Sequence, residues 1–139
     1  MAEPLAVLDT NVIVSGFLSP HGPPGRIVEC LRQGAVRAVV DDRIAAEYRA
    51  VLRRPELRLP AAEVETVLAQ ILSHAVWADV APGCTPGTLP DADGVPFAEC
   101  AAAAECPLVT GNRRHFPANA VGEPVLSPAQ FVERVKAAE

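Results

Sequence analysis

Residues 5–12 read Leu-Ala-Val-Leu-Asp-Thr-Asn-Val, an apolar run followed directly by polar residues. The run of four apolar residues predicts a short buried strand. Asp9, Thr10 and Asn11 follow directly at its end. In an open parallel sheet, ligands bind outside the carboxyl ends of the strands. The opening of the chain therefore predicts a strand that carries a polar cluster to the ligand-binding edge of a sheet.

Strand-like and helix-like patterns alternate along the rest of the chain. Short apolar runs predict further strands at residues 36–40, 75–80, 108–110 and 125–126. Helices are predicted from Pro24, after Asp41 or Asp42, over residues 64–72, over residues 95–105 and after Ser127. This alternation predicts an α/β fold with a central parallel sheet and helices on both of its faces.

Composition narrows the class of protein. The chain has 139 residues, which predicts a single domain over residues 1–139. Half of the residues are hydrophobic and 21% are charged, which is typical of a globular protein and excludes general disorder. No run approaches the roughly 20 apolar residues of a membrane helix. The acidic start, Met1-Ala2-Glu3-Pro4, does not resemble a signal peptide, so a cytoplasmic protein is expected.

Acidic and amide side chains recur beside predicted strands and helices. Asp9 and Asn11 follow the first strand, and Glu47 lies at the margin of the apolar stripe of a helix, where a carboxylate is expected to be partly buried. Further along the chain there are two more polar clusters, Asp91 with Asp93 and Thr110 with Asn112. The sequence therefore predicts that carboxylates and carboxamides gather at one edge of the sheet.

Each of these residues also has a plain structural interpretation. Asp9, Asp91 and Asp93 could cap helices or form turns, and Asn112 could be a turn residue after Gly111. Glu47 could pair with an arginine such as Arg43.

Taken together, the side chains favour a metal site. Clusters of oxygen ligands suit Mg²⁺ or Mn²⁺. Such ions serve phosphodiester hydrolysis, because they polarise the phosphoryl oxygen and lower the pKa of a bound water.

The motifs together resemble those of PIN-domain proteins, of the kind found as VapC-type toxins in bacterial toxin–antitoxin systems. The segments that carry the resemblance are Val7-Leu8-Asp9-Thr10-Asn11-Val12, Glu47-Tyr48 with Val51-Leu52-Arg53-Arg54-Pro55, Asp91-Ala92-Asp93 before Phe97, Val109 to Pro117, and Leu126-Ser127-Pro128 before Phe131. They occur in the expected order and cover nearly the whole chain. The resemblance implies a three-layer α/β/α sandwich and a Mg²⁺- or Mn²⁺-dependent ribonuclease, with RNA as substrate, a cognate antitoxin as partner and a homodimer as the usual assembly.

The resemblance also implies roles for single residues. Asp9, Glu47 and Asp93 would be catalytic and hold the metal ion, with Asp91 as the alternative third ligand. Asn11, Thr110 and Asn112 would orient waters and ligands. Two positions depart from the family: Gly94 stands in a segment that is commonly a denser acidic run, and Asn112 replaces a fourth acid.

Basic residues lie beside two of the acidic motifs. Arg53, Arg54, Arg113 and Arg114 could grip the phosphates of RNA, or could be ordinary solvated surface. The net charge is −5, so contact with nucleic acid needs such a local patch.

Two other functions compete with an active ribonuclease. A catalytically weakened PIN fold that binds RNA or protein is suggested by Gly94 and Asn112. A phosphatase or receiver domain also starts with a strand that ends in Asp. The phosphatase usually needs a second Asp where this chain has Asn11, and the receiver needs a well-placed lysine, whereas the only lysine is Lys136 in the predicted last helix.

Overall fold

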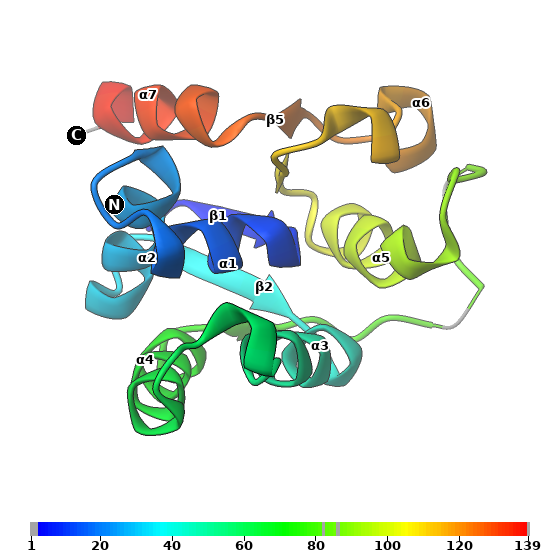
Figure 1. The fold of residues 1–139 in the computed structure, drawn as a ribbon. Coiled ribbons are helices and arrows are strands. Elements are labelled where there is room, and N and C mark those ends of the chain that lie inside the picture. Colours follow the sequence, from blue (N-terminus) through cyan, green and yellow to red (C-terminus); the bar gives the residue numbers. More distant parts are fainter. Residues whose placement is uncertain (1–2, 82, 86, 139) are drawn as a thin grey trace.

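Five parallel strands form one sheet in the computed structural model, which describes residues 3–81, 83–85 and 87–138. The strands are β1 (Leu5–Leu8), β2 (Arg37–Val40), β3 (Val76–Trp77), β4 (Leu108–Val109) and β5 (Val125–Leu126). Their order across the sheet is β3-β2-β1-β4-β5, so β1 lies in the middle (Figure 1). Residues Met1 and Ala2, which contributed to the expectation of a cytoplasmic protein, lie outside the described residues.

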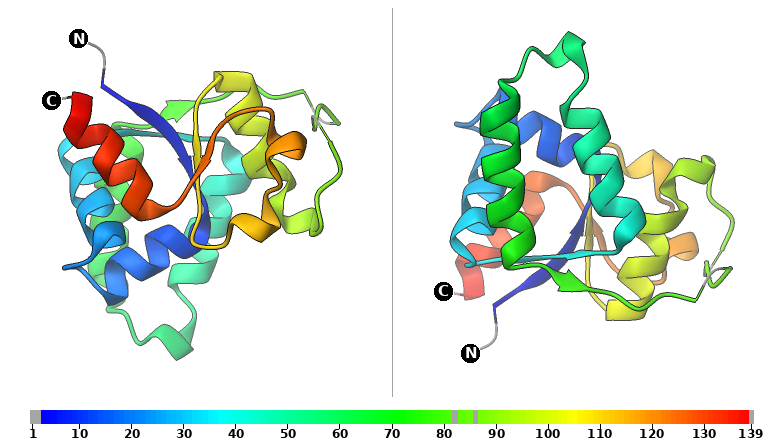
Figure 2. Two further views of the ribbon diagram at one scale, coloured as in Figure 1. Left: turned by 90° about the horizontal axis from the view of Figure 1, so that it is seen from above. Right: turned by 90° about the horizontal axis from the view of Figure 1, so that it is seen from below.

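The helices form a layer on each side of this sheet. The α-helices are α1 (Thr10–Leu18), α2 (Pro23–Gln33), α3 (Asp42–Leu52), α4 (Ala61–Ser73), α5 (Val95–Ala104), α6 (Ala118–Val121) and α7 (Pro128–Ala138). Helix α2 packs against α1, α4 and α7, while α5 packs against α6 and against strands β1 and β2 (Figure 2). The predicted α/β/α sandwich with a central parallel sheet is therefore confirmed.

The order of the strands explains this division. Parallel strands are joined by right-handed crossovers. The chain moves from β1 to β2 and then β3 in one direction, which places α1 to α4 on one face. It then returns to β4 on the other side of β1, which places α5 and α6 on the opposite face. The direction reverses between β1 and β4, and such a switch point is where open α/β sheets bind ligands.

Most element boundaries follow from local sequence signals. The side chain of Asp41, and not that of Asp42, accepts a hydrogen bond from the Ile44 N–H and caps α3. Gly34 ends α2 in the left-handed conformation at φ 80°. The strand predicted at residues 75–80 is shorter, Val76–Trp77, because β3 is an edge strand that pairs with β2 alone.

The core lies on both faces of the sheet. Its largest fully buried side chains include Tyr48, Phe97, Phe131, Leu8 and Ile13.

Within the described residues, no helix is both long enough and apolar enough to cross a lipid bilayer.

Candidate functional site

Asp9 lies where β1 ends and α1 begins, at the switch point of the sheet. Its backbone N–H donates to the carbonyl of Val109 on β4 at 2.9 Å. Its carboxylate Oδ2 accepts a hydrogen bond from Thr110 Oγ1 at 2.7 Å. Asp9 occupies the N-cap position of α1, yet its side chain makes no capping hydrogen bond. The capping interpretation therefore does not account for this carboxylate, which is held by the neighbouring strand instead.

Thr110 connects the end of β4 to this carboxylate. It is fully buried, and its hydroxyl accepts the backbone N–H of Asn112 at 3.0 Å while it donates to Asp9. Nearby, Asn11 Oδ1 accepts the backbone N–H of Gly111 at 3.2 Å. The segment after β4 thus donates two hydrogen bonds to side chains that follow β1, and these contacts join the ends of the two strands.

Glu47 reaches the same region from α3. It is partly buried, as predicted, and its carboxylate accepts a hydrogen bond from Thr10 Oγ1. The next residue, Tyr48, is fully buried and donates its hydroxyl to the carbonyl of Leu8 at 2.5 Å. Arg43, the arginine that the sequence offered as a partner for Glu47, is paired with other acids. Glu47 is therefore oriented by the first turn of α1, because Thr10 opens that helix.

The third acidic segment is a short 3-10 turn, η2 (Ala92–Gly94), directly before α5. Asp91 caps this turn, since its Oδ1 accepts the backbone N–H of Asp93 at 2.9 Å. Both carboxylates are exposed. The turn-forming interpretation thus holds for Asp91, and Asp93 is the acid of this pair whose carboxylate is not engaged in that cap.

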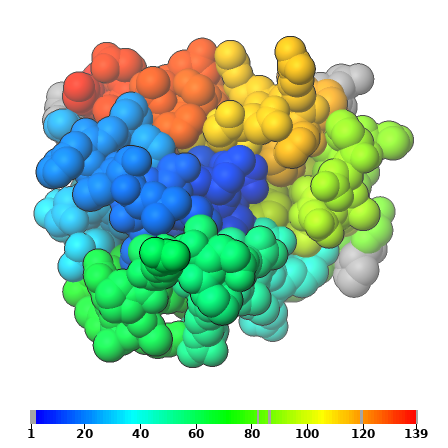
Figure 3. Space-filling view, viewed as in Figure 1, coloured from blue at the N-terminus to red at the C-terminus, as the bar shows by residue number. Residues whose placement is uncertain are grey.

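The carboxylates of Asp9, Glu47, Asp91 and Asp93 belong to residues that line one hollow of about 530 Å³. Figure 3 shows the face on which the four contributing segments meet: the start of α1, the end of α3, η2 with α5, and the turn around residue 115. The polar residues that line it are Asp9, Thr10, Asn11, Glu47, Arg54, Asp91, Asp93 and His115. A larger hollow of about 710 Å³, bordered by α2, α4 and α7, contains none of the predicted site residues.

The acids surround this hollow without forming a tight cluster. Among the residues that the structure describes, no three side chains of His, Cys, Asp or Glu are grouped so that they could hold a metal ion together. The donors are nevertheless all oxygens, and Mg²⁺ is usually held by one or two carboxylates with several waters retained. The residues present therefore fit a hydrated Mg²⁺ or Mn²⁺ ion bound through few direct contacts.

The carboxyl group of Asp9 has a pKa above its ordinary value. Burial is the main cause, because it disfavours the charged form. The Thr110 hydroxyl, the backbone of Thr10 and the nearby His115 act in the opposite direction without cancelling it. A cation in the hollow would favour the ionised carboxylate, so the raised pKa is consistent with a residue that faces positive charge when a ligand is bound.

The two departures from the family pattern have separate structural explanations. Asn112 caps another 3-10 turn, η3 (Arg113–His115): its Oδ1 accepts the backbone N–H of Arg114 at 3.3 Å. A Cβ atom on Gly94 would lie 3.0 Å from the ring of Phe116, so this position is packed against an aromatic side chain. Asn112 is thus engaged in a turn and Gly94 in packing.

The four predicted arginines do not form one patch. Arg54 lines the hollow. Arg53 pairs with Glu65 on α4 at 2.6 Å, and Arg113 donates to Gln130 on α7 at 3.3 Å. Arg114 is exposed. Of the four, Arg54 is the one that borders the acids.

Sequence reasoning did not single out His115. It lines the hollow, and its Nε2 lies 3.2 Å from Asn112 Nδ2. In the sequence it directly follows Arg113 and Arg114, and that position indicates only a basic cluster. Phe97 and Phe116 also line the hollow, and their rings meet edge to face with their centroids 6.3 Å apart.

A parallel sheet with an acidic hollow at its switch point defines a class of α/β proteins that bind charged ligands at the strand ends. Within that class, the family profile of the PIN domain matches residues 6–114. The chain therefore belongs to the PIN domain family, a family of nucleases.

Solved structures of other proteins share the fold, among them the following two. One is VapBC2 from Rickettsia felis bound to a DNA fragment from its promoter, with 18% identity, a TM-score of 0.57, and coverage of 88% of this chain and 98% of that chain. The other is FitAB bound to the IR36 DNA fragment, with 19% identity, a TM-score of 0.60, and coverage of 88% and 94%. No match was found among curated proteins.

Proposed function

We propose that this PIN-domain protein is a Mg²⁺- or Mn²⁺-dependent endoribonuclease and the toxin of a toxin–antitoxin pair. The main support is the convergence of Asp9, Glu47 and Asp93, from three different elements, on one hollow at the switch point of the sheet. Side chains that are scattered through the sequence and meet at the ligand-binding edge are expected for a catalytic site.

In this proposal Asp9 and Glu47 hold the metal ion, and Asp93 contributes from the exposed rim. Bound there, the ion would activate a water and stabilise the charge of the phosphoryl group. Thr110 and Thr10 fix the two inner carboxylates, since each hydroxyl donates to one of them. Such supporting hydrogen bonds set the orientation of ligand side chains.

Binding of a polyanion at an acidic hollow needs compensating positive charge. Arg54 is placed to provide it, because it lines the hollow and its guanidinium can contact phosphate oxygens. Arg114 and Arg113, on the neighbouring turn η3, could contact phosphates further from the cleaved bond. RNA as the substrate is part of the proposal and follows from the family resemblance.

The partner in this proposal is a cognate antitoxin protein. It is supported by the shared fold with chains from the VapBC2 and FitAB structures. Assembly as a homodimer and a cytoplasmic location remain predictions from the sequence.

Cleavage of a labelled, structured RNA by the purified protein tests the activity. We expect cleavage with Mn²⁺, loss of cleavage on addition of a chelator, and loss in Asp9→Asn. Asp42→Asn is a matched control, because Asp42 is an exposed acid in the first turn of α3 that does not line the hollow. Cleavage that survives both the chelator and Asp9→Asn would contradict a metal-dependent site at this position.

A second function is favoured by one observation. The acids do not form a group of three within the described residues, and Asn112 stands where many relatives carry an acid. A protein that binds RNA without cutting it would fit this weaker site. RNA binding that needs no divalent ion, with no cleavage at any Mn²⁺ concentration, would support this alternative.

A further inference from the structure

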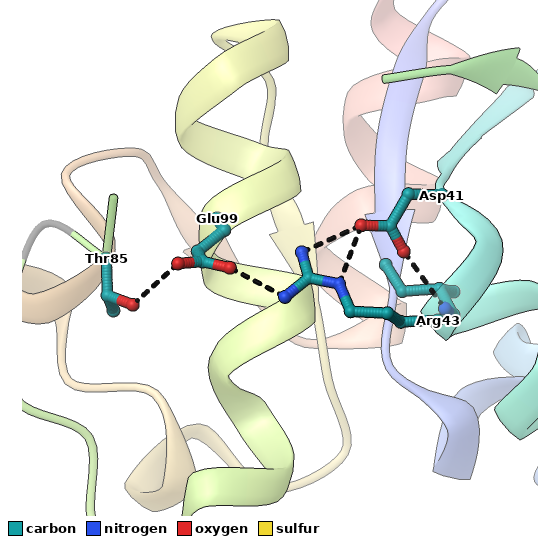
Figure 4. Close-up of polar contacts among 5 residues, drawn as sticks. Asp41, Arg43, Thr85 and Glu99 are labelled. Atoms are coloured by element: carbon teal, nitrogen blue, oxygen red, sulfur yellow. Dashed lines mark hydrogen bonds and ion pairs between the residues drawn. The ribbon is translucent and has the colours of Figure 1, made fainter. Parts of the chain in front are cut away.

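A second polar network lies beside the site, and no step of the proposed hydrolysis uses it. Arg43 donates from Nη1 to Glu99 Oε1 at 2.7 Å, and from Nη2 and Nε to Asp41 Oδ2 at 2.7 and 2.9 Å (Figure 4). The other oxygen of Glu99 accepts the hydroxyl of Thr85 at 3.0 Å. The guanidinium therefore bridges two acids that are far apart in the sequence.

Glu99 is the unusual member of this network. Its side chain is only 1% exposed, and an unpaired carboxylate would be costly at that depth. Burial by itself would raise the pKa of its carboxyl group, but the hydrogen bonds from Arg43 and Thr85 lower it below its ordinary value. Glu99 is therefore ionised and depends on Arg43, which makes this contact persistent.

The contact joins α3, which carries Glu47, to α5, the helix that follows the turn η2 with Asp91 and Asp93. Arg43 lies on α3 four residues before Glu47, so the two side chains project from the same face one turn apart. Glu99 lies on α5, six residues after Asp93, and α5 continues directly from the turn η2. At about 1.5 Å of rise per residue, each end of the contact is within about 10 Å of its acid along the chain.

We propose that the pair Arg43–Glu99 is a positioning clamp that sets the spacing between Glu47 and the Asp91–Asp93 segment. This deepens the proposed function, because the spacing matters only if these acids share a ligand. In this role neither residue touches the ligand. They act by fixing α3 against the start of α5, so that the hollow keeps the width that a hydrated ion needs.

The loss of charge and the loss of spacing predict opposite changes in Mn²⁺ affinity when Arg43 is replaced. By charge alone, loss of a cation one helical turn from Glu47 would strengthen the binding of Mn²⁺. Loss of spacing would weaken it, and supporting contacts of metal ligands typically account for about 10–100-fold in affinity. The sign of the change in Mn²⁺ affinity therefore separates the two effects.

The chain offers a matched control on the same helix. Arg49 also pairs across a helix interface, with Glu65 on α4 at 3.6 Å, and its side chain is 41% exposed, as is that of Arg43. Arg49→Met removes the same charge from the same helix, two residues after Glu47, but leaves the contact between α3 and α5 in place.

Two measurements on the full-length protein test the clamp. The first is the calorimetric affinity for Mn²⁺ alone, without RNA. The second is the distance distribution between spin labels on α3 and η2, at the exposed positions Ala46→Cys and Ala92→Cys, in a background with Cys30→Ser and Cys84→Ser. For Arg43→Met we expect Mn²⁺ affinity to fall by about tenfold or more and the label distances to shift or broaden. For Arg49→Met we expect neither change.

Either measurement can overturn the proposal. Unchanged label distances or unchanged Mn²⁺ affinity in folded Arg43→Met would do so, even if the variant melts at a lower temperature. If Arg43→Met does not fold, Glu99→Leu replaces it, since leucine fills a similar volume without an acceptor for Arg43, which keeps its contacts with Asp41; wild-type values in both measurements would again overturn the clamp. If the unaltered protein binds no Mn²⁺, the metal site of the proposed function has failed, and the label distances alone decide whether the clamp exists.

Discussion

The hydrogen bond from the Tyr48 hydroxyl allows a test of how much the contact between the site and the core contributes to stability. It donates to the carbonyl of Leu8, the last residue of β1, and both residues are fully buried. Tyr48→Phe keeps the ring and its packing but removes the donor. A buried acceptor that loses its partner costs about 1–3 kcal/mol. We therefore expect the free energy of unfolding to fall by about 2 kcal/mol, which lowers the melting temperature by about 6 °C in a domain of this size.

Urea unfolding monitored by circular dichroism, together with scanning calorimetry, measures this change. The control is Thr66→Val, which removes an exposed hydroxyl that donates to the carbonyl of Ala62 at 2.9 Å. Water can replace that donor, so the control should lose less than about 0.5 kcal/mol. Equal losses in the two variants, or a loss below about 0.5 kcal/mol in Tyr48→Phe, would refute the argument that burial of the Leu8 carbonyl makes its hydrogen bond important.

Three further predictions concern the site itself. Burial raises the pKa of the Asp9 carboxyl, so Mn²⁺ affinity should fall as the pH falls through that raised pKa. In the metal-free protein, the protonated carboxyl contributes to stability at low pH, and this contribution is lost as the pH rises through the raised pKa. Unfolding titrations should therefore show that Asp9→Asn is more stable than wild type at neutral pH. Gly94→Asp should lower the free energy of unfolding by about 1–3 kcal/mol, because its Cβ would press on the Phe116 ring at 3.0 Å; thermal melting would contradict this if the variant were as stable as wild type. Arg54→Ala should weaken RNA binding and reduce the slope of log affinity against log salt by about 0.7, whereas Arg53→Ala, which breaks the pair with Glu65, should change the slope less; equal slopes in filter-binding assays would refute the distinction.

The fold was predictable because its signals are local. The apolar run at residues 5–8 is β1 with the same bounds, and residues 125–126 form β5 as expected. The strand predicted at residues 75–80 was too long. Its apolar residues continue past Trp77, but pairing depends on the neighbouring strand β2, which ends at Val40. Sequence patterns show which residues prefer to be extended, whereas the partner strand decides how many of them pair.

Of the candidate site, only the acidic residues could be predicted from the sequence. Asp9 follows a strand, Glu47 sits on a helix face and Asp93 precedes a helix, and the structure places all three around one hollow. The contacts that orient them were not visible in the sequence. Arg43 illustrates the reason: its position suggested a pair with Glu47 four residues away, but its partner on the other helix is 56 residues away. The packing of the helices determines such partners, and the spacing of residues along one helix does not indicate how the helices pack.

The hydrogen bond from Thr110 to Asp9 spans 101 residues, and it has a consequence for synthesis of the protein. A ribosome makes β1 and α3 long before it makes β4. Until β4 has emerged and docked beside β1, Asp9 lacks the donor that holds its carboxylate, and the middle strand lacks one of its two neighbours. We therefore expect a nascent chain, or one terminated before β4, to carry its acids in an unassembled state, so that the site matures only after β4 has docked beside β1.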